Sequence, residues 1–350
     1  MPESPVKILI LKPSSLGDVV QALPVLRLLK RRFPESQVYW WLSSDLLSLL
    51  EEDPQVAGVF SFERRRWSVP WRWPELLASV RQMRAQAFDW VIDLQGLARS
   101  GWLAWFVNGR LTVGVEDPRE GAGAFYDLAV PRSSPQTHAV DWYLSVLVRL
   151  GVDVSGDFEW LPVRSKAAAV VRQKWPVLNH RWIALQPGAR WLNKRWPVEH
   201  FIALVQRLAQ DLPDHRFALL GSRSDAALTA PIVRAAPGRC VDLAGQTTLP
   251  EMIEWLRAVE VLITNDTGPM HVAAALNKPV VALFGPTDPR RTGPYGQIDR
   301  VLRLDLPCSP CLSSSCRHHP FMECLEALQP GLVGERVLQR MGRMELARSE

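Results

Sequence analysis

Residues 6–18, VKILILKPSSLGD, decide the fold class. The apolar run 6–11 has the length and the Val, Ile and Leu content of a buried strand. In the polar turn that follows, Gly17 lets the backbone turn tightly, and Asp18 belongs to a residue type that favours the start of a helix. Apolar positions within 19–33 then approximate helical spacing. A strand, a tight turn and a helix in this order predict a βα unit.

The same alternation continues along the chain in two series. The first series predicts further strands at 38–42, 56–60, 90–94 and 111–115, and helices at 74–85 and 138–150. The second predicts strands at 182–186, 217–220, 241–243, 261–264 and 280–284, and helices at 197–210, 250–258, 269–276 and 325–341. Such patterns are typical of parallel sheets covered by helices.

The periodicity weakens between about residue 151 and residue 181, which marks a domain boundary. We therefore expect an α/β protein with two Rossmann-like domains, residues 1–165 and 178–325, and a C-terminal helix within 326–350. Two such domains facing each other would place the carboxyl ends of their strands around a shared cleft, where doubly wound sheets bind ligands.

Composition narrows the functional classes. The chain has 350 residues, 47% of them apolar and 22% charged, which suits two globular domains. The formal net charge of +5 favours anionic small ligands over nucleic acid. No secretory signal is visible, and apolar stretches such as 102–107 fall far below the roughly 20 residues of a membrane span. We expect a cytoplasmic protein.

Familiar catalytic signatures are missing from the sequence. It contains no G-x-x-x-x-G-K-[ST], no G-x-G-x-x-G after the first strand, no G-x-S-x-G and no H-E-x-x-H. ATPase, dinucleotide dehydrogenase, hydrolase and zincin activities lose support. The most polar chemistry lies instead in the turns that join strands to helices.

The first of these turns ends at Asp18. A carboxylate at the carboxyl end of the first strand could act as a general base toward an attacking hydroxyl. Alternatively, Asp18 only caps the helix and complements its dipole. The residues alone leave both roles open.

The second turn is residues 264–271, TNDTGPMH. Gly268 lets a ligand approach the backbone, and the N-terminus of the following helix favours a phosphate, to which Thr267 adds a hydroxyl. Asp266 could accept hydrogen bonds from sugar hydroxyls. In the alternative, Asp266 or Thr267 caps the helix and His271 fills a core position.

A third turn follows the strand at 182–186. Gly188 and Ala189 offer backbone donors, and Lys194, just before another helix, supplies a mobile positive charge suited to a diphosphate. A single lysine is more often a solvated surface residue, so its role depends on the fold.

Several blocks, in this order, resemble glycosyltransferase family 9, the ADP-heptose lipopolysaccharide heptosyltransferases. The blocks are KPSSLGDVVQALPVLRLLKRRFP (12–34), VIDLQGLARSG (91–101), PGARWLNKRWPVEHF (187–201), LLGSRSD (219–225), DLAGQTTL (242–249), TNDTGPMHVAAAL (264–276) and VALFGPTDP (281–289). The resemblance covers nearly the whole chain. Within the family, residues 95–97 and DPREGAGAFYD (117–127) most resemble heptosyltransferase I, which adds the first heptose to Kdo-lipid A.

The resemblance implies a GT-B fold, with the donor held mainly by the C-terminal domain and the acceptor by the N-terminal one. It also implies an inverting transfer of heptose from ADP-heptose to the Kdo inner core of lipopolysaccharide, with no cofactor and no metal on the diphosphate. Carried onto this chain, it assigns these roles: Asp18 as catalytic base, Lys194, Thr267 and Gly268 on the diphosphate, Asp266 and His271 along the sugar, and Asp242 on the ribose.

The sequence departs from the family pattern in two places. Pro13 stands where Thr is common, and Gly188 and Ala189 replace two hydroxyl residues of heptosyltransferase I, so phosphate contacts there must come from the backbone. Two rivals remain: a family member that uses a different nucleotide sugar, and a non-catalytic nucleotide-sugar receptor.

A basic and aromatic segment follows the third predicted strand. It comprises Arg64, Arg65, Arg66, Trp67, Trp71, Arg72 and Trp73, and Arg119 in block 117–127 is a further candidate. Arginine forks suit the carboxylates and phosphates of a Kdo-lipid A acceptor, and tryptophans suit a membrane headgroup layer. We expect acceptor binding and peripheral contact with the inner face of the cytoplasmic membrane; the alternative is a solvated loop.

Four of the five cysteines crowd into one stretch: Cys308, Cys311, Cys316 and Cys324. The first pair has the C-x2-C spacing of metal ligands, and four thiols could hold a tetrahedral zinc ion. Reduced free thiols are the alternative, since stable disulfides are rare in the cytosol.

Overall fold

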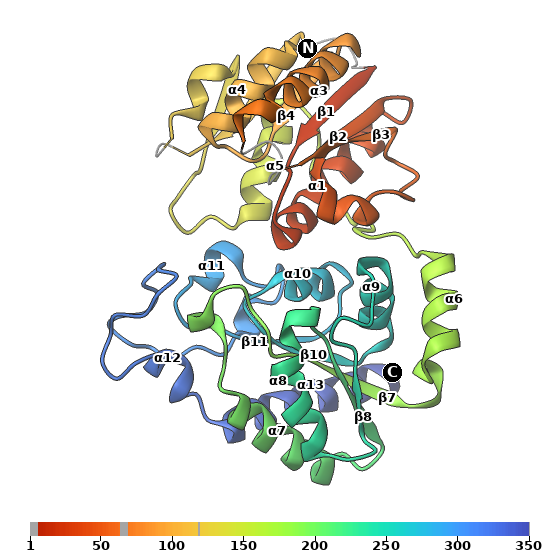
Figure 1. Ribbon diagram of the computed structural model, residues 1–350, viewed down its shortest axis with the longest axis vertical. Helices are drawn as coiled ribbons and strands as arrows, with labels where there is room; N and C mark the ends of the chain where they lie inside the picture. The colour runs from red at the N-terminus through yellow and green to blue at the C-terminus, as the bar shows by residue number, and fades with distance from the viewer. Residues whose placement is uncertain (1–5, 64–68, 118–119, 350) are drawn as a thin grey trace. The chain divides into compact units, whose positions relative to one another are not determined.

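The computed structural model describes residues 6–63, 69–117 and 120–349, without the side chains of residues 70 and 343–349. The chain divides into two compact units, residues 1–162 and 163–350 (Figure 1). Each unit is built around one parallel sheet.

The first unit has a six-stranded sheet in the order β3-β2-β1-β4-β5-β6. Its strands are β1 (Lys7–Leu11), β2 (Gln37–Ser43), β3 (Gly58–Phe62), β4 (Trp90–Asp93), β5 (Leu111–Glu116) and β6 (Leu128–Pro131). The central strand β1 is apolar and fully buried from Ile8 to Leu11, because it has a neighbour on each side and helices above and below. The chain order reverses between β1 and β4, which pair in parallel.

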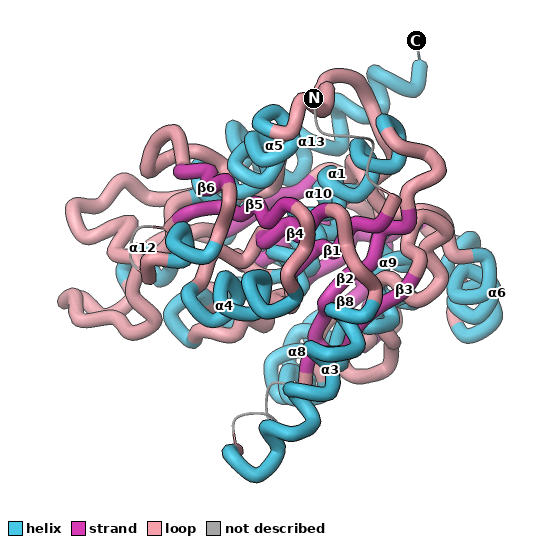
Figure 2. The backbone as a smooth tube through the Cα atoms, turned by 90° about the horizontal axis from the view of Figure 1, so that it is seen from above, coloured by secondary structure: helices cyan, strands magenta, loops and turns pink. Residues whose placement is uncertain are grey.

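Helices cover both faces of this sheet: α1 (Leu16–Arg32), α3 (Trp73–Ala85), α4 (Ala98–Val107) and α5 (Ala139–Arg149). Helices α1 and α5 contact each other, and so do α3 and α4. The α3–α4 pair packs Met83 and Leu103 against Leu9 and Leu11 of β1. Figure 2 shows α1 and α5 on the opposite side of the strands from α4.

The second unit has a five-stranded parallel sheet in the order β11-β10-β7-β8-β9. Its strands are β7 (Arg181–Gln186), β8 (His215–Leu219), β9 (Cys240–Asp242), β10 (Val261–Asn265) and β11 (Val280–Leu283). Its helices are α6 (Ser165–Lys174), α7 (Val198–Asp211), α8 (Ala226–Ala235), α9 (Leu249–Ala258), α10 (Gly268–Ala275), α11 (Pro289–Thr292), α12 (Glu323–Glu326) and α13 (Pro330–Ser349). Val333 and Val337 of α13 are fully buried in the core of this unit.

The two parallel sheets with covering helices confirm the predicted fold class. Sequence analysis missed β6, α4, α6, α8 and α11. It also predicted one helix over 325–341, whereas the structure has α12 and then α13. Pro330 explains the break, because proline lacks the N–H that would continue a helix but fits the first position of a new one.

Helix α6 belongs to the second unit and contacts α9. It lies in the stretch that the sequence analysis left between the two predicted domains. Across the part of the chain that the structure describes, no helix is both long and apolar enough to cross a bilayer.

Candidate active site

The carboxyl ends of β7, β10 and β11 bring three loops of the second unit together. Strand β10 lies between the other two, with Thr264 opposite Gln186 of β7 and Asn265 opposite Leu283 of β11. The chain order reverses between β10 and β7, the position at which open α/β sheets bind ligands.

Asp266 joins these three loops. Its Oδ2 lies 2.5 Å from Nζ of Lys194, which comes from the loop after β7. The hydroxyl of Thr287, from the loop after β11, donates to the same oxygen at 2.6 Å. Asp266 is buried. Its carboxylate thus has one partner on each of the two neighbouring loops. The Lys194 ammonium also lies over the Trp191 ring, 4.6 Å from its centroid.

Asn265 holds the loop that carries Lys194. Its side chain is fully buried, donates to the carbonyl of Pro187 at 2.7 Å and accepts from the backbone N–H of Trp196 at 3.1 Å. One amide thus fixes the loop on either side of Lys194.

The N-terminus of α10 lies directly after Asp266. Thr267 is its N-cap in extended conformation, and Gly268 and Pro269 open the helix. The first N–H groups of a helix have no partner within it and attract anions. His271 is buried in the same helix. The structure therefore places Lys194, Asp266, Thr267, Gly268 and His271 at one edge of the sheet.

Gly188 and Ala189 lie in the loop after β7 at the same edge. A Cβ on Gly188 would come within 2.5 Å of the Asp225 carboxylate, so a larger residue here would have to displace that side chain. Asp225 is itself held by the backbone N–H and hydroxyl of Ser222, at 2.8 and 2.7 Å. The carbonyl of Ala189 accepts from Arg195.

Asp242 lies apart from the Lys194 group. It ends β9 at the far edge of the sheet, with β8 and β7 between it and β10. Its carboxylate accepts from the Thr229 hydroxyl and from the backbone of Ala244, both at 3.0 Å.

In the first unit, Asp18 is half-buried in the first turn of α1. Its Oδ2 accepts from the backbone N–H and the hydroxyl of Ser15, at 2.9 and 2.7 Å. Asp18 thus completes the capping box of α1, in which Ser15 is the N-cap, and the same bonds fix the orientation of its carboxylate.

Lys12 is a buried neighbour of this turn. Its ammonium donates to the carbonyl of Leu94 at 3.0 Å and lies over the Tyr143 ring. Burial opposes the charged form, but the Tyr143 phenol and the Asp18 carboxylate outweigh it, so the pKa of Lys12 is raised. The Lys12 ammonium therefore interacts electrostatically with Asp18.

Asp93 ends β4 and is fully buried. Burial raises the pKa of Asp93, against the opposing effect of the Tyr126 hydroxyl, which donates to it at 2.7 Å. The backbone of Gln95 also donates to this carboxyl at 2.8 Å. Asp93 therefore organises the loop after β4.

Of the predicted acceptor residues, Arg64, Arg65, Arg66 and Arg119 lie outside the described residues. Arg72 is described, and its guanidinium forms an ion pair with Glu75, 2.6 Å away on α3.

The four clustered cysteines line one cavity of about 410 Å³ in the second unit, together with Asn193 and Pro286. Burial, reinforced by the other three thiols, raises the pKa of Cys324 to about 11. Within residues 6–63, 69–117 and 120–349, no three His, Cys, Asp or Glu side chains are arranged to hold a metal ion.

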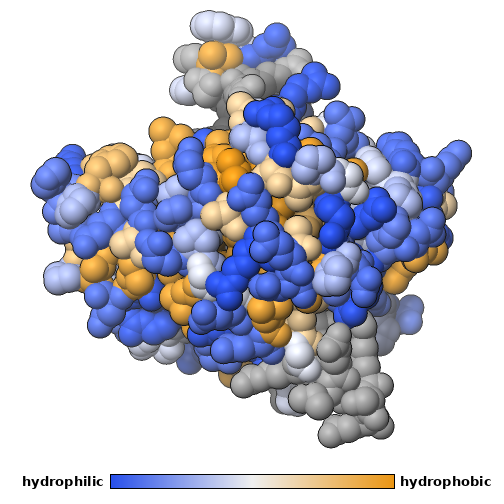
Figure 3. All heavy atoms as spheres, turned by 90° about the horizontal axis from the view of Figure 1, so that it is seen from below, coloured by the Kyte–Doolittle hydropathy of each residue, from blue (hydrophilic) through white to orange (hydrophobic). Residues whose placement is uncertain are grey.

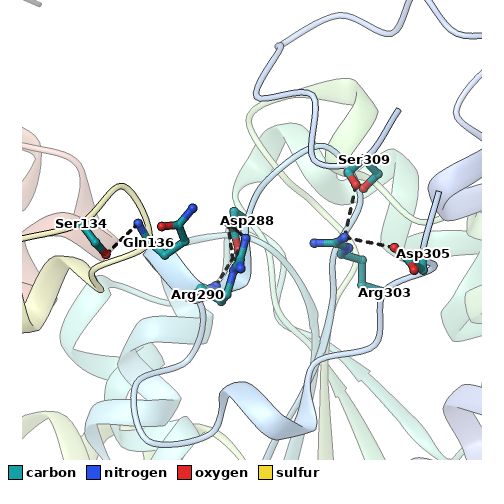
Figure 4. A network of polar contacts seen from close by, with 7 residues as sticks. All are labelled: Ser134, Gln136, Asp288, Arg290, Arg303, Asp305 and Ser309. Atoms are coloured by element: carbon teal, nitrogen blue, oxygen red, sulfur yellow. Dashed lines mark hydrogen bonds and ion pairs between the residues drawn. The ribbon is translucent and has the colours of Figure 1, made fainter. Parts of the chain in front are cut away.

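Hydrogen bonds connect the segment that contains the four clustered cysteines to the loops after β7 and β11. The amide of Asn193 donates to the carbonyl of Ser313 at 2.9 Å, and the hydroxyl of Ser309 donates to Gly285 at 2.6 Å. Arg303 donates to the carbonyl of Ser309 at 3.2 Å (Figure 4). In the loop after β11, Arg290 pairs with Asp288, which lowers the pKa of that carboxyl.

Sequence reasoning missed Thr287, Asn265 and Lys12. Each one adjoins a quoted block or lies within it, and each follows or ends a strand. That position was the available signal, but only the paired strands show which loops meet.

Known proteins resemble this chain over most of its length. The sequence profile of "Glycosyltransferase family 9 (heptosyltransferase)" matches residues 76–322. Lipopolysaccharide heptosyltransferase 1 of Pseudomonas aeruginosa is 31% identical over 332 residues, which is 91% of this chain and 89% of that protein.

Two solved structures share the fold over nearly their whole length. The glycosyltransferase family 9 protein of Veillonella parvula has a TM-score of 0.80 at 22% identity, covering 96% of this chain and 97% of that one. Escherichia coli heptosyltransferase WaaC with ADP has a TM-score of 0.77 at 23% identity, covering 95% and 99%. These likenesses show two Rossmann-like domains of the GT-B class, and the sequence matches show that the chain belongs to glycosyltransferase family 9, the heptosyltransferases.

Proposed function

We propose that this glycosyltransferase moves heptose from ADP-heptose to the Kdo-lipid A inner core of lipopolysaccharide. The observation that carries the proposal is the Lys194–Asp266–Thr287 group at the N-terminus of α10. It combines a cation, sugar-binding oxygens and a helix end, the elements that a sugar diphosphate needs. The related P. aeruginosa protein is a lipopolysaccharide heptosyltransferase, and WaaC has been solved with ADP and with ADP-2-deoxy-2-fluoro heptose.

On the donor side, Lys194 and the N–H groups of Thr267 and Gly268 bind the diphosphate, with backbone donors from Gly188 and Ala189. Asp266 and His271 contact the heptose. Asp242 binds the ribose. It is the last residue of β9, at the far edge of the same sheet.

On the acceptor side, Asp18 is the catalytic base. The acceptor hydroxyl attacks the anomeric carbon from the face opposite ADP, while the bond from that carbon to the diphosphate oxygen breaks. The proton goes to Asp18, and the negative charge goes to ADP. Lys194 and the start of α10 stabilise that charge as it develops, because both are fixed before the reaction.

Ser15 and Lys12 prepare Asp18 for this step. Two hydrogen bonds from Ser15 hold its carboxylate, and that carboxylate favours the charged form of the buried Lys12 ammonium.

Arg64, Arg65, Arg66, Arg72 and Arg119 bind the anionic acceptor, and the protein contacts the inner face of the cytoplasmic membrane peripherally. Arginine supports this assignment because its guanidinium matches carboxylates and phosphates bidentately. The proposal requires no cofactor.

The test is ADP release by the purified protein with Kdo-lipid A and a panel of donors: ADP-heptose, ADP-glucose, UDP-glucose and GDP-mannose. We expect turnover with ADP-heptose alone, with a product heavier by one heptose in mass spectrometry. Turnover with another donor would instead support a family member that uses a different nucleotide sugar.

A further inference from the structure

The described tryptophans that are more than half exposed all belong to one side of the first unit. They are Trp71 (76%), Trp73 (55%), Trp102 (51%) and Trp105 (56%). Trp71 lies in the 3-10 turn Pro70–Arg72 that precedes α3, Trp73 begins α3, and the other two lie on α4. Helices α3 and α4 contact each other and pack on the same face of the sheet.

The apolar stripe of helix α3 extends beyond the residues that pack on the core. Trp73, Leu76, Leu77 and Val80 follow helical spacing. Val80 packs against the core, and Met83 is the buried residue of this helix, but Trp73 and Leu77 are more than half exposed. The N-terminal half of the stripe therefore faces water.

Helix α4 also presents aromatic rings outward. Trp102 and Trp105 each pack edge-on against Phe106, with ring centroids 4.4 and 5.0 Å apart. The opposite side of the helix, with Leu103 and Val107, is buried in the core. Helix α4 therefore has two apolar sides, of which only one packs on the core formed by the described residues of this unit.

The charged residues around these rings are mostly basic. The 3-10 turn, α3 and α4 contain four arginines, Arg72, Arg81, Arg84 and Arg99, and one acid, Glu75. Arg81, Arg84 and Arg99 are exposed. Figure 3 draws one face of the molecule, on which hydrophobic side chains are dispersed among hydrophilic ones.

We propose that the outer side of the α3–α4 layer, with Trp71, Trp73, Leu77, Trp102 and Trp105, docks on an anionic lipid bilayer. Tryptophan prefers the bilayer–water interface, where its ring is apolar and its N–H stays hydrated. Arginines beside it are attracted to anionic headgroups. An amphipathic helix with such a composition lies in the plane of the interface.

The choice of this occupant rests on the proposed function, because Kdo-lipid A is anchored in a lipid layer. Docking by this face would keep the enzyme at the surface where its acceptor is embedded, which goes beyond acceptor recognition by the site itself.

The test is co-sedimentation of the full chain with vesicles, without donor or acceptor. Vesicles of phosphatidylcholine with phosphatidylglycerol are compared with phosphatidylcholine alone. We expect binding to the anionic vesicles, about tenfold or more weaker for the variant Trp71→Ser/Trp73→Ser/Trp102→Ser/Trp105→Ser. The variant Arg81→Gln/Arg84→Gln/Arg99→Gln should lose the preference for anionic lipid and its salt dependence.

The matched control is Leu178→Ser, since Leu178 is 75% exposed in the second unit and should bind vesicles like the unsubstituted chain. Unchanged ADP affinity shows that each variant is folded. Equal vesicle binding by the four-tryptophan variant, or no binding by the unsubstituted chain, overturns the proposal. A dimer that this variant dissolves would assign the face to a second copy instead. Vesicle binding and ADP release are separate measurements, so a failure of docking is distinguishable from a failure of the proposed transfer.

Discussion

Lys194 and Asp266 are 72 residues apart in sequence, and their side chains form an ion pair of 2.5 Å between neighbouring loops of the second sheet. Sequence analysis assigned them to different parts of the donor, the diphosphate and the sugar. The pairing means that the ammonium is already oriented, and that a diphosphate competes with one carboxylate oxygen for it. Thr287 on the same oxygen keeps Asp266 in place during that exchange.

Replacing Lys194 by alanine should lower kcat/KM about 100-fold or more, because the cation that stabilises departing ADP is removed. Lys194→Arg keeps the charge and should recover part of the loss. Steady-state ADP release and donor affinity are measured on the same preparations. Unchanged kcat/KM in the alanine variant would assign Lys194 to a purely structural ion pair.

Asp18→Asn should lower kcat by roughly 100-fold or more while ADP-heptose still binds, as expected for removal of a general base. The amide can still accept from Ser15, so the helix cap is largely kept. Ser15→Ala removes one of the two hydrogen bonds that hold the carboxylate but leaves the base, so it should lower kcat far less than Asp18→Asn. Near-normal turnover of Asp18→Asn would leave Asp18 with the capping role alone.

Replacing Arg64, Arg65 and Arg66 together by alanine should raise the KM for acceptor and leave donor affinity intact. The salt dependence of activity should flatten, since exposed charge attraction is what salt screens. The measurement is acceptor KM at low and high ionic strength. An unchanged KM at low salt would mean that other residues hold the acceptor.

The cysteine cluster leaves two alternatives, a structural zinc ion and reduced thiols, and metal analysis of protein purified without chelator distinguishes them. We expect reduced thiols, because no three of the described side chains are arranged to hold a metal ion. One zinc ion for each chain, lost when Cys308 and Cys311 are replaced by serine but kept in Cys240→Ser, would contradict this expectation. In metal-free protein, Cys324 should react with an alkylating reagent slowly at neutral pH and faster as pH approaches about 11, because only the thiolate is nucleophilic. Protein without stoichiometric zinc would leave the four residues as reduced thiols.

Glu260 gives the second unit a defined pH dependence. Burial opposes its ionisation, but Arg181 and His215 outweigh burial, so the pKa of Glu260 is lowered in the folded protein. A lowered pKa contributes stability above the unfolded value of about 4.3, and this contribution is lost as pH falls through the folded pKa.

Glu260→Gln should therefore destabilise the protein at pH 7 by about 1–3 kcal/mol and reduce the loss of stability on acidification. Denaturant unfolding at pH 7 and pH 4 measures both. Asp211→Asn is the control, since its pair with Arg207 is exposed and worth little. An equal effect of the two substitutions would count against the role of Glu260.

Periodicity was sufficient to predict the buried strands, because short runs such as Ile8 to Leu11 or Val261 to Thr264 are almost entirely apolar and are buried in the sheet. It also identified Asp266 and Lys194 as polar residues that follow strands. It could not identify their partner Thr287, because that contact depends on β11 lying beside β10. Nor could it predict α4, whose two apolar sides obscure the helical pattern.

The contact between Gly188 and Asp225 restricts how this enzyme can evolve. A Cβ at position 188 would lie 2.5 Å from the Asp225 carboxylate, so a larger residue there must displace that side chain from its hydrogen bonds with Ser222. The cost of a substitution at position 188 therefore depends on the residue at position 225, and the two sites should be epistatic among descendants of this sequence.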